Sequence, residues 1–88
     1  MDEQNIRMKR ARYFREEYFA DEADDHTQCE FLLQYLRRFD SITPLEALNA
    51  FGCLRLSARV ADLRADGYSI TTELHKGTKN YAIYRLED

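Results

Sequence analysis

The sequence contains no long apolar run and little cysteine. No stretch approaches the roughly 20 apolar residues that a membrane-spanning helix needs, and the first residues lack the apolar stretch of a signal peptide. The two cysteines, Cys29 and Cys53, form no CxxC pair. Because small secreted domains are usually rich in disulfides, this low count favours a reducing compartment and a core without cross-links. We therefore expect a soluble, cytoplasmic protein.

Patterns that carry enzymatic or metal chemistry are missing as well. The histidines, His26 and His75, and the two cysteines do not show the paired spacing of a zinc site. The sequence has no Ser/His/Asp or Cys/His arrangement and no Gly-rich phosphate loop. A chain of 88 residues is too short for the large α/β enzyme folds, and it buries only about 60–65% of its unfolded surface. We predict one small domain that is not an enzyme and uses no metal or cofactor.

The net charge of −3 is unusual for a nucleic-acid-binding domain, which is normally basic. The charge is unevenly spread along the chain, however. Residues 1–15 contain five basic and two acidic residues, whereas 16–26 contain six acidic and no basic ones. Residues 27–88 are balanced overall, but 53–86 hold six basic and three acidic residues. The acidity therefore comes from one short segment, and the second half of the chain is locally basic.

A first helix is predicted over residues 4–20, which are mostly good helix formers without glycine or proline. One stripe at helical spacing consists of Ile6, Arg10, Tyr13, Phe14 and Tyr18. Because this stripe is only partly apolar, the helix requires a partner surface, either in its own domain or on a second subunit. The candidates for an oligomerisation contact are Tyr13, Phe14, Tyr18 and Phe19. The acidic residues 20–26 are predicted to form a linker or loop.

Two further helices are indicated by capping sequences. Residues 27–30, Thr-Gln-Cys-Glu, fit a capping box and predict a helix that starts at Thr27 and ends at Asp40. Its core stripe is Phe31, Leu32, Tyr35, Leu36 and Phe39. After an extended link over 41–43, residues 43–46, Thr-Pro-Leu-Glu, start a brief helix with proline at the first helical position. Its expected inner face is Leu45, Ala47 and Leu48, and it ends near Phe51 and Gly52.

The periodicity changes after the next helix, which is predicted over 54–66 and ends at Gly67. Its inward side chains are Leu56, Val60 and Leu63. Residues 68–74 then alternate with a period of two, 75–80 form a polar turn, and 81–86 are the returning strand. An isolated hairpin is marginally stable, so it is expected to pack on the helices.

The predicted order after the N-terminal helix is helix, short strand, helix, glycine turn, helix and hairpin, which is a helix-turn-helix followed by a wing. The stretches ITPLEAL, GCLRLSARVADLRADGYSITT and YAIYRL resemble the small winged helix-turn-helix domain of phage and prophage proteins. The resemblance covers about residues 28–86, and the residues in register are Pro44, Gly52, Leu56, Arg59, Leu63, Gly67 and Ile70. It implies an α+β, mostly helical fold with a three-helix core, a wing of two or three strands, and a DNA-binding role in a bacterial host cell. We divide the chain into an N-terminal helix with its linker (1–26) and the winged helix-turn-helix domain (27–88).

The last helix is the candidate for reading DNA. With its apolar side chains turned inward, its remaining faces present Arg55, Ser57, Ala58, Arg59 and Asp62. Arginine can bind O6 and N7 of guanine, and residues near the start of a recognition helix are expected to meet base edges. Candidates for contact with the DNA backbone or the minor groove lie in the hairpin turn, at His75, Lys76, Lys79 and Asn80.

Structural interpretations of the same residues stand beside these. Arg59 can pair with Glu46 on the preceding helix. Asp62 can orient Arg59 or Arg55, and Arg64 complements the dipole at the end of its helix. The lysines of the hairpin can be ordinary turn residues.

Two functions are consistent with the sequence. The first is sequence-specific binding of double-stranded DNA by a phage-type regulator or accessory factor, as a homodimer because one small domain makes few phosphate contacts. The basic start of the first helix could also extend that surface. The second is a protein-interaction module on a winged-helix fold, such as a phage-encoded inhibitor of a host protein, in which the acidic segment docks or mimics DNA.

Overall fold

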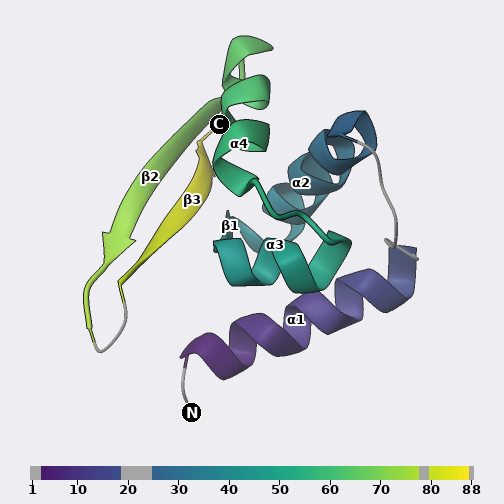
Figure 1. Ribbon diagram of the computed structural model, residues 1–88, viewed down its shortest axis with the longest axis vertical. Coiled ribbons are helices and arrows are strands. Elements are labelled where there is room, and N and C mark those ends of the chain that lie inside the picture. Colours follow the sequence, from purple (N-terminus) through teal and green to yellow (C-terminus); the bar gives the residue numbers. More distant parts are fainter. Residues whose placement is uncertain (1–2, 19–24, 78–79, 88) are drawn as a thin grey trace.

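The computed structural model describes residues 3–18, 25–77 and 80–87 (Figure 1). In chain order these contain α1 (Glu3–Tyr18), α2 (Asp25–Phe39), β1 (Ser41–Ile42), α3 (Pro44–Phe51), α4 (Leu56–Ala65), β2 (Ser69–His75) and β3 (Tyr81–Glu87). The order agrees with the one predicted from the sequence.

The link predicted over 41–43 supplies the third strand of the sheet. β1 pairs antiparallel with β3, so that Ser41 lies opposite Arg85. β3 pairs in turn with β2, and His75 lies opposite Tyr81 at the turn end of the hairpin. The strand order is β1-β3-β2. The predicted winged helix-turn-helix fold is thereby confirmed, with β2 and β3 as the wing and α1 as the additional N-terminal helix.

α2 starts earlier than the sequence predicted. Its first residue is Asp25, so Thr27 lies inside the helix and the predicted capping box over 27–30 is wrong. Residues 25 and 26 likewise belong to α2 and not to the predicted linker. Acidic residues are in general favourable near the N-terminus of a helix, where the backbone dipole is positive, so an acidic stretch of sequence does not by itself exclude a helix. The predicted core stripe is buried at Leu32, Tyr35 and Leu36 and partly buried at Phe31 and Phe39.

The capping sequence of α3 is confirmed. The backbone N–H of Glu46 donates to Oγ1 of Thr43 at 3.3 Å, and the backbone N–H of Thr43 donates to the Glu46 carboxylate at 3.1 Å. Pro44 occupies the first turn, and Gly52 ends the helix in the left-handed conformation with φ 67°. That conformation is the one in which glycine carries no steric cost.

The inner face of α3 differs from the predicted one. Leu45 and Leu48 are exposed, whereas the buried residues are Glu46, Ala47, Ala50 and Phe51. A carboxylate is buried here because arginines of α1, 36 and 39 residues away in the chain, bond to it. With the Glu46 side turned inward, the two leucines face outward.

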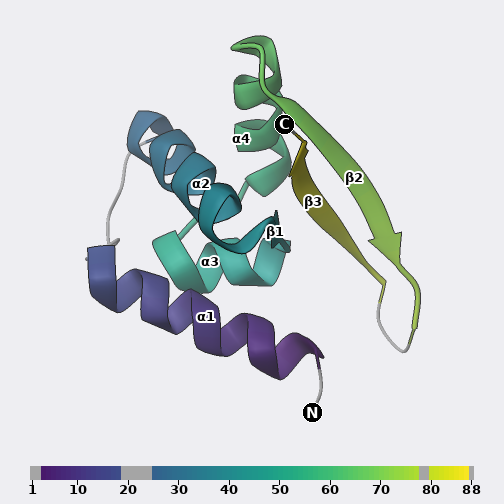
Figure 2. The same cartoon turned by 180° about the vertical axis from the view of Figure 1, so that it is seen from behind.

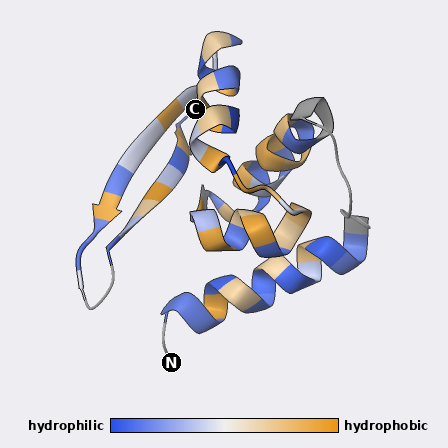
Figure 3. Cartoon of the chain, in the orientation of Figure 1, coloured by the Kyte–Doolittle hydropathy of each residue, from blue (hydrophilic) through white to orange (hydrophobic). Residues whose placement is uncertain are grey.

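α1 lies along α3 and completes the core, as the views from both sides show (Figures 1 and 2). Ala11 and Phe14 have no exposed surface. The Phe14 ring packs edge-on against Phe31, Tyr35 and Phe51, with centroids 5.1–6.1 Å apart. The rest of α1 is mostly hydrophilic (Figure 3). The partner surface that α1 requires is therefore in its own domain, and the oligomerisation role predicted for Phe14 is wrong because this ring is part of the core.

The other aromatic residues of this segment are placed differently. Tyr13 is 55% exposed, with the guanidinium carbon of Arg38 5.0 Å from its ring centroid. The side chain of Tyr18, together with Phe19 and residues 20–24, lies outside the described residues.

Candidate nucleic-acid interface

A tight turn fixes the start of α4. The backbone N–H groups of Gly52 and Cys53 donate to carbonyl groups of α3 at 3.0 and 3.2 Å. The Cys53 side chain is buried, whereas Leu54 and Arg55, which follow it, are exposed. Arg55 is the N-cap residue, so α4 begins at Leu56 and not at residue 54 as predicted.

The predicted inward face of α4 is confirmed, because Leu56, Val60 and Leu63 are buried. On its other faces Ser57 and Asp62 are exposed and Ala58 is partly buried. α3 lies between α4 and α1 in both views (Figures 1 and 2). The N-terminal helix therefore leaves the outer surface of α4 uncovered.

Arg59 is held by its own helix and is not displayed to solvent. Its side chain is only 13% exposed, and its Nε lies 3.1 Å from Oδ2 of Asp62. The predicted pairing of Arg59 with Glu46 is wrong, because Glu46 bonds to arginines of α1. Asp62 therefore orients Arg59, which is one of the roles that the sequence suggested for it.

The Arg59 side of α4 borders α2. Sγ of Cys29 on α2 lies 3.8 Å from Oδ2 of Asp62. Burial and, next, the charge of Asp62 raise the pKa of the Cys29 thiol. The thiol is consequently protonated at neutral pH and donates to the carboxylate.

Arg64 joins α4 to the wing. Its Nε and Nη2 donate to the backbone oxygen of Ile70 at 2.9 and 2.6 Å, and Nη2 also donates to Oγ1 of Thr72 at 2.9 Å. The sequence assigned Arg64 only a favourable position in the last turn of the helix, which it also has. These bonds tie β2 to the end of α4, so the wing and the helix form one surface.

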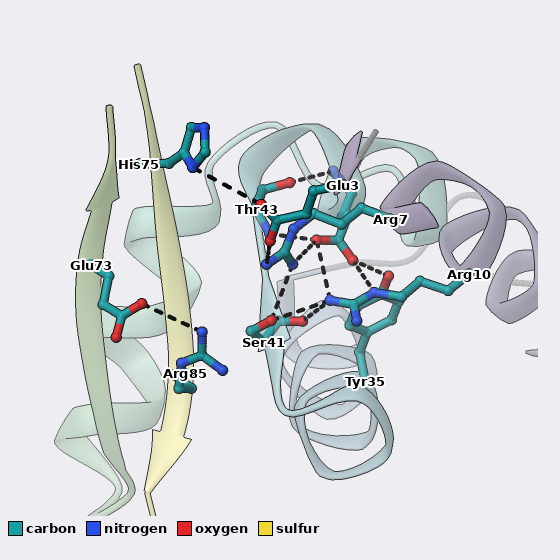
Figure 4. Close-up of polar contacts among 10 residues, drawn as sticks. Glu3, Arg7, Arg10, Tyr35, Ser41, Thr43, Glu73, His75 and Arg85 are labelled. Carbon is teal, nitrogen blue, oxygen red and sulfur yellow. Dashed lines mark hydrogen bonds and ion pairs between the residues drawn. The ribbon is translucent and has the colours of Figure 1, made fainter. Parts of the chain in front are cut away.

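The hairpin turn presents part of the predicted set of contacts. Lys76 and Asn80 are exposed, and Lys79 lies outside the described residues. Further along the strands, Nη2 of Arg85 lies 3.4 Å from the carboxylate of Glu73 (Figure 4). Among the described residues of the turn, the exposed cationic side chain is therefore that of Lys76.

His75 faces the protein at the base of the turn. Its ring stacks on Tyr81 with centroids 4.5 Å apart, and its Nδ1 lies 4.0 Å from a Glu3 carboxylate oxygen of α1 (Figure 4). Tyr68 and Tyr84 pack against the core. These tyrosines thus serve packing.

Glu46 is the centre of a buried polar cluster that the sequence did not predict. Figure 4 shows the other members of the cluster, Arg7, Arg10, Tyr35 and Ser41, pointing toward one another. Nη1 of Arg7 lies 2.6 Å from one of its carboxylate oxygens, and Nε of Arg10 lies 2.8 Å from the other. The Tyr35 hydroxyl also donates to this carboxylate. Both arginines bond to Ser41 of β1 as well. The cluster therefore joins α1 to α2, β1 and α3 at one point.

The cluster places two charged side chains of α1 inside the protein, where they pair with Glu46. Burial lowers the pKa of Arg7, but hydrogen bonds and charges from Glu46 and Glu3 outweigh burial and raise it overall. Burial and the Glu46 carboxylate raise the pKa of Tyr35. The basic start of α1 had suggested that its charges extend a DNA-binding surface. Arg7 and Arg10 do not, because their guanidinium groups are bonded inside the protein. The sequence signal for this cluster was Arg10 in the predicted stripe of the first helix, because a cation on a buried stripe requires a buried acidic partner.

The described residues were searched for a metal site and for a membrane-spanning helix. No three His, Cys, Asp or Glu side chains in these ranges are grouped so that they could hold a metal ion. Within the described ranges, no helix combines the length and apolar character needed to cross a membrane.

Comparison with known proteins identifies the domain. A family model described as a winged helix-turn-helix domain matches residues 27–88, which include the turn, α4 and the wing. Searches of curated proteins and of solved structures gave no match to the chain. The matched fold suggests DNA binding. The match covers most of the chain and agrees with its architecture, and the chain therefore belongs to the winged helix-turn-helix domain family.

Proposed function

We propose that the protein binds double-stranded DNA sequence-specifically, with α4 in the major groove and residues 75–80 against the backbone. The observation that carries this proposal is the exposed Arg55 at the start of α4, on a surface that α1 leaves uncovered. Residues at the start of a recognition helix meet base edges, and arginine can form two hydrogen bonds with guanine. Arg55 is therefore assigned to base contact.

The residues of α4 that follow Arg55 favour close approach of the helix to DNA rather than electrostatic attraction. Ser57 and Ala58 are small and let the helix lie deep in the groove. Arg59 and Asp62 act as a pair at the edge of the interface, where Asp62 keeps Arg59 oriented. Sequence readout in this arrangement depends on Arg55 more than on Arg59.

The wing supplies the backbone contacts. Lys76 and Lys79 bind phosphate oxygens, and Asn80 donates a hydrogen bond to the same strand. His75 shapes the base of the turn through its stacking on Tyr81. With so few cations, useful affinity requires a dimer on a two-fold site. Tyr13, Tyr18 and Phe19 are the residues proposed to line its interface.

A DNA-binding domain of this size fits a phage-type transcriptional regulator or accessory factor in the cytoplasm of a bacterial cell. The test is selection of bound duplexes from a random-sequence pool, followed by affinity measurements on the selected duplex across a salt series. Log affinity is expected to fall linearly with log salt, with a slope of about −0.9 per phosphate contacted. Lys76→Ala is expected to reduce the slope by about one, whereas Lys9→Ala on α1 leaves it unchanged.

A protein-interaction module is the second candidate function. It is favoured by the pairing of Arg59 with Asp62, which offsets one positive charge of α4, and by Arg64, whose guanidinium is engaged in hydrogen bonds to the wing. Absence of DNA binding at low salt would contradict the first function and favour this one. The acidic segment 16–26 would then be the proposed docking surface for a host protein or a mimic of DNA.

A further inference from the structure

Leu54 stands out among the apolar side chains of the described residues. It is 84% exposed, whereas the other exposed large apolar residues are between 41% and 59% exposed. Leucine is normally buried, because removing its side chain from water contributes about 1.5–3 kcal/mol to folding. The fold gains almost none of that stabilisation from Leu54.

The exposure of Leu54 is fixed by the turn and not by fraying of the chain. The buried Cys53 precedes it, and the buried Leu56 follows one residue after Arg55. The backbone N–H of Cys53 is anchored to α3, and the carbonyl of Arg55 accepts the first hydrogen bonds of α4. Leu54 is therefore held between two anchored residues, immediately before the N-cap residue of α4.

The surroundings of Leu54 are polar and cationic. It lines a shallow surface hollow together with Gln28, Gly52, Arg55 and Arg59. An apolar side chain beside an arginine at the start of a recognition helix matches the major-groove edge of DNA, where bases present acceptors to arginine and thymine presents a C5-methyl group. Among the four bases, that methyl group is the apolar feature of the major groove.

We infer that Leu54 is a specificity-determining residue that contacts the C5-methyl group of a thymine next to the base pair bound by Arg55. This inference rests on the proposed function, since it deepens the account of how α4 reads DNA. Its partner is defined by chemistry: Leu54 selects a methyl group, while Arg55 selects a guanine.

Replacing thymine with deoxyuridine removes this methyl group and leaves the base pairing intact. The probe is the duplex recovered by selection from the random pool, with each thymine replaced by deoxyuridine in turn. At one position next to the guanine contacted by Arg55, the replacement is expected to weaken binding about fourfold, the value of one buried methyl-sized group. Leu54→Ala is expected to weaken binding to the thymine duplex by a similar factor.

The combination of both changes identifies the contact. On the deoxyuridine duplex, Leu54→Ala is expected to have little further effect, because the group that it contacted is already gone. Ile6→Ala, a matched change of an exposed apolar residue on α1, is expected to leave the preference for thymine unchanged. Because Leu54 is so exposed, thermal unfolding of Leu54→Ala should match that of the unchanged protein.

The outcomes separate this inference from the proposed function. Specific DNA binding that depends on Arg55 but is insensitive to every deoxyuridine replacement would overturn the role of Leu54 and leave the function intact. Equal effects of Leu54→Ala on both duplexes, or a change in oligomeric mass on this substitution, would also overturn it. If no duplex is selected, the proposed function itself fails.

Discussion

Replacing Glu46 with glutamine should destabilise the protein more than most single substitutions. The carboxylate is fully buried and pairs with Arg7, whose side chain is only 5% exposed, and with Arg10, which is 20% exposed. Glutamine keeps the shape and some hydrogen bonds but removes the buried negative charge that both arginines contact, and Arg7 keeps only its pairing with the half-exposed Glu3 carboxylate. Breaking a buried ion pair in this way costs about 3–5 kcal/mol. This is a large part of the roughly 5–15 kcal/mol that stabilises a small domain.

The assay is denaturant unfolding followed by far-UV circular dichroism, with Glu16→Gln on the exposed side of α1 as the control. The control is expected to change the free energy of unfolding by no more than about 0.5 kcal/mol. Replacing Arg7, Arg10, Tyr35 and Glu46 together with apolar residues of similar size is expected to recover most of the loss, since no buried charge then remains. A loss below about 1 kcal/mol for Glu46→Gln, typical of an exposed pair, would refute the buried cluster.

Three further substitutions test the local structure. Thr43→Ala removes the N-cap of α3 and is expected to lower the free energy of unfolding by about 1 kcal/mol in the same assay, whereas an unchanged value would mean that the capping bonds contribute nothing. Gly52→Ala is expected to cost about 1–2 kcal/mol because its φ of 67° is strained for alanine although nothing crowds the added Cβ; an unaffected variant would argue against this turn. Because burial and Asp62 raise the pKa of Cys29, its thiolate fraction at a given pH is low, so alkylation should be slower than for a free cysteine and faster in Asp62→Asn. Equal alkylation rates in the two proteins at mildly alkaline pH would contradict the contact between Cys29 and Asp62.

The parts of the fold that were predictable from the sequence depend on local chemistry. Thr43 and Glu46 cap α3 because both bonds lie within one turn, and Gly67 follows α4 with φ 103°, a conformation that favours glycine. The inward face of α4 was predictable because its three apolar residues repeat at helical spacing.

The parts that were missed depend on contacts between distant segments. The local pattern identified the capping role of Glu46, but its pairing with arginines of α1 is invisible in a short window. That pairing turns Leu45 and Leu48 outward, against the apolar pattern of α3. Arg59 pairs with its helix neighbour Asp62, whereas Glu46 pairs with the arginines of α1.

The exposure of the candidate interface residues was predictable only in part, for a physical reason. Exposure at a helix start follows from the turn, so the exposed position of Arg55 could be predicted from the sequence. Whether an arginine on the flank of a helix is free depends on its neighbours in space, and Arg59 and Arg64 are both bonded within the domain. The exposure of Leu54 was not predicted, because the helix predicted from the sequence included this residue.

Chemical-shift changes of the backbone amides on titration with the selected duplex test the central claim most directly. If α4 and the wing bind DNA, the changes concentrate at residues 54–62 and 75–77, while the amides of α1 change little. Changes centred on α1 or on the outer face of α2, with α4 unaffected, would contradict it.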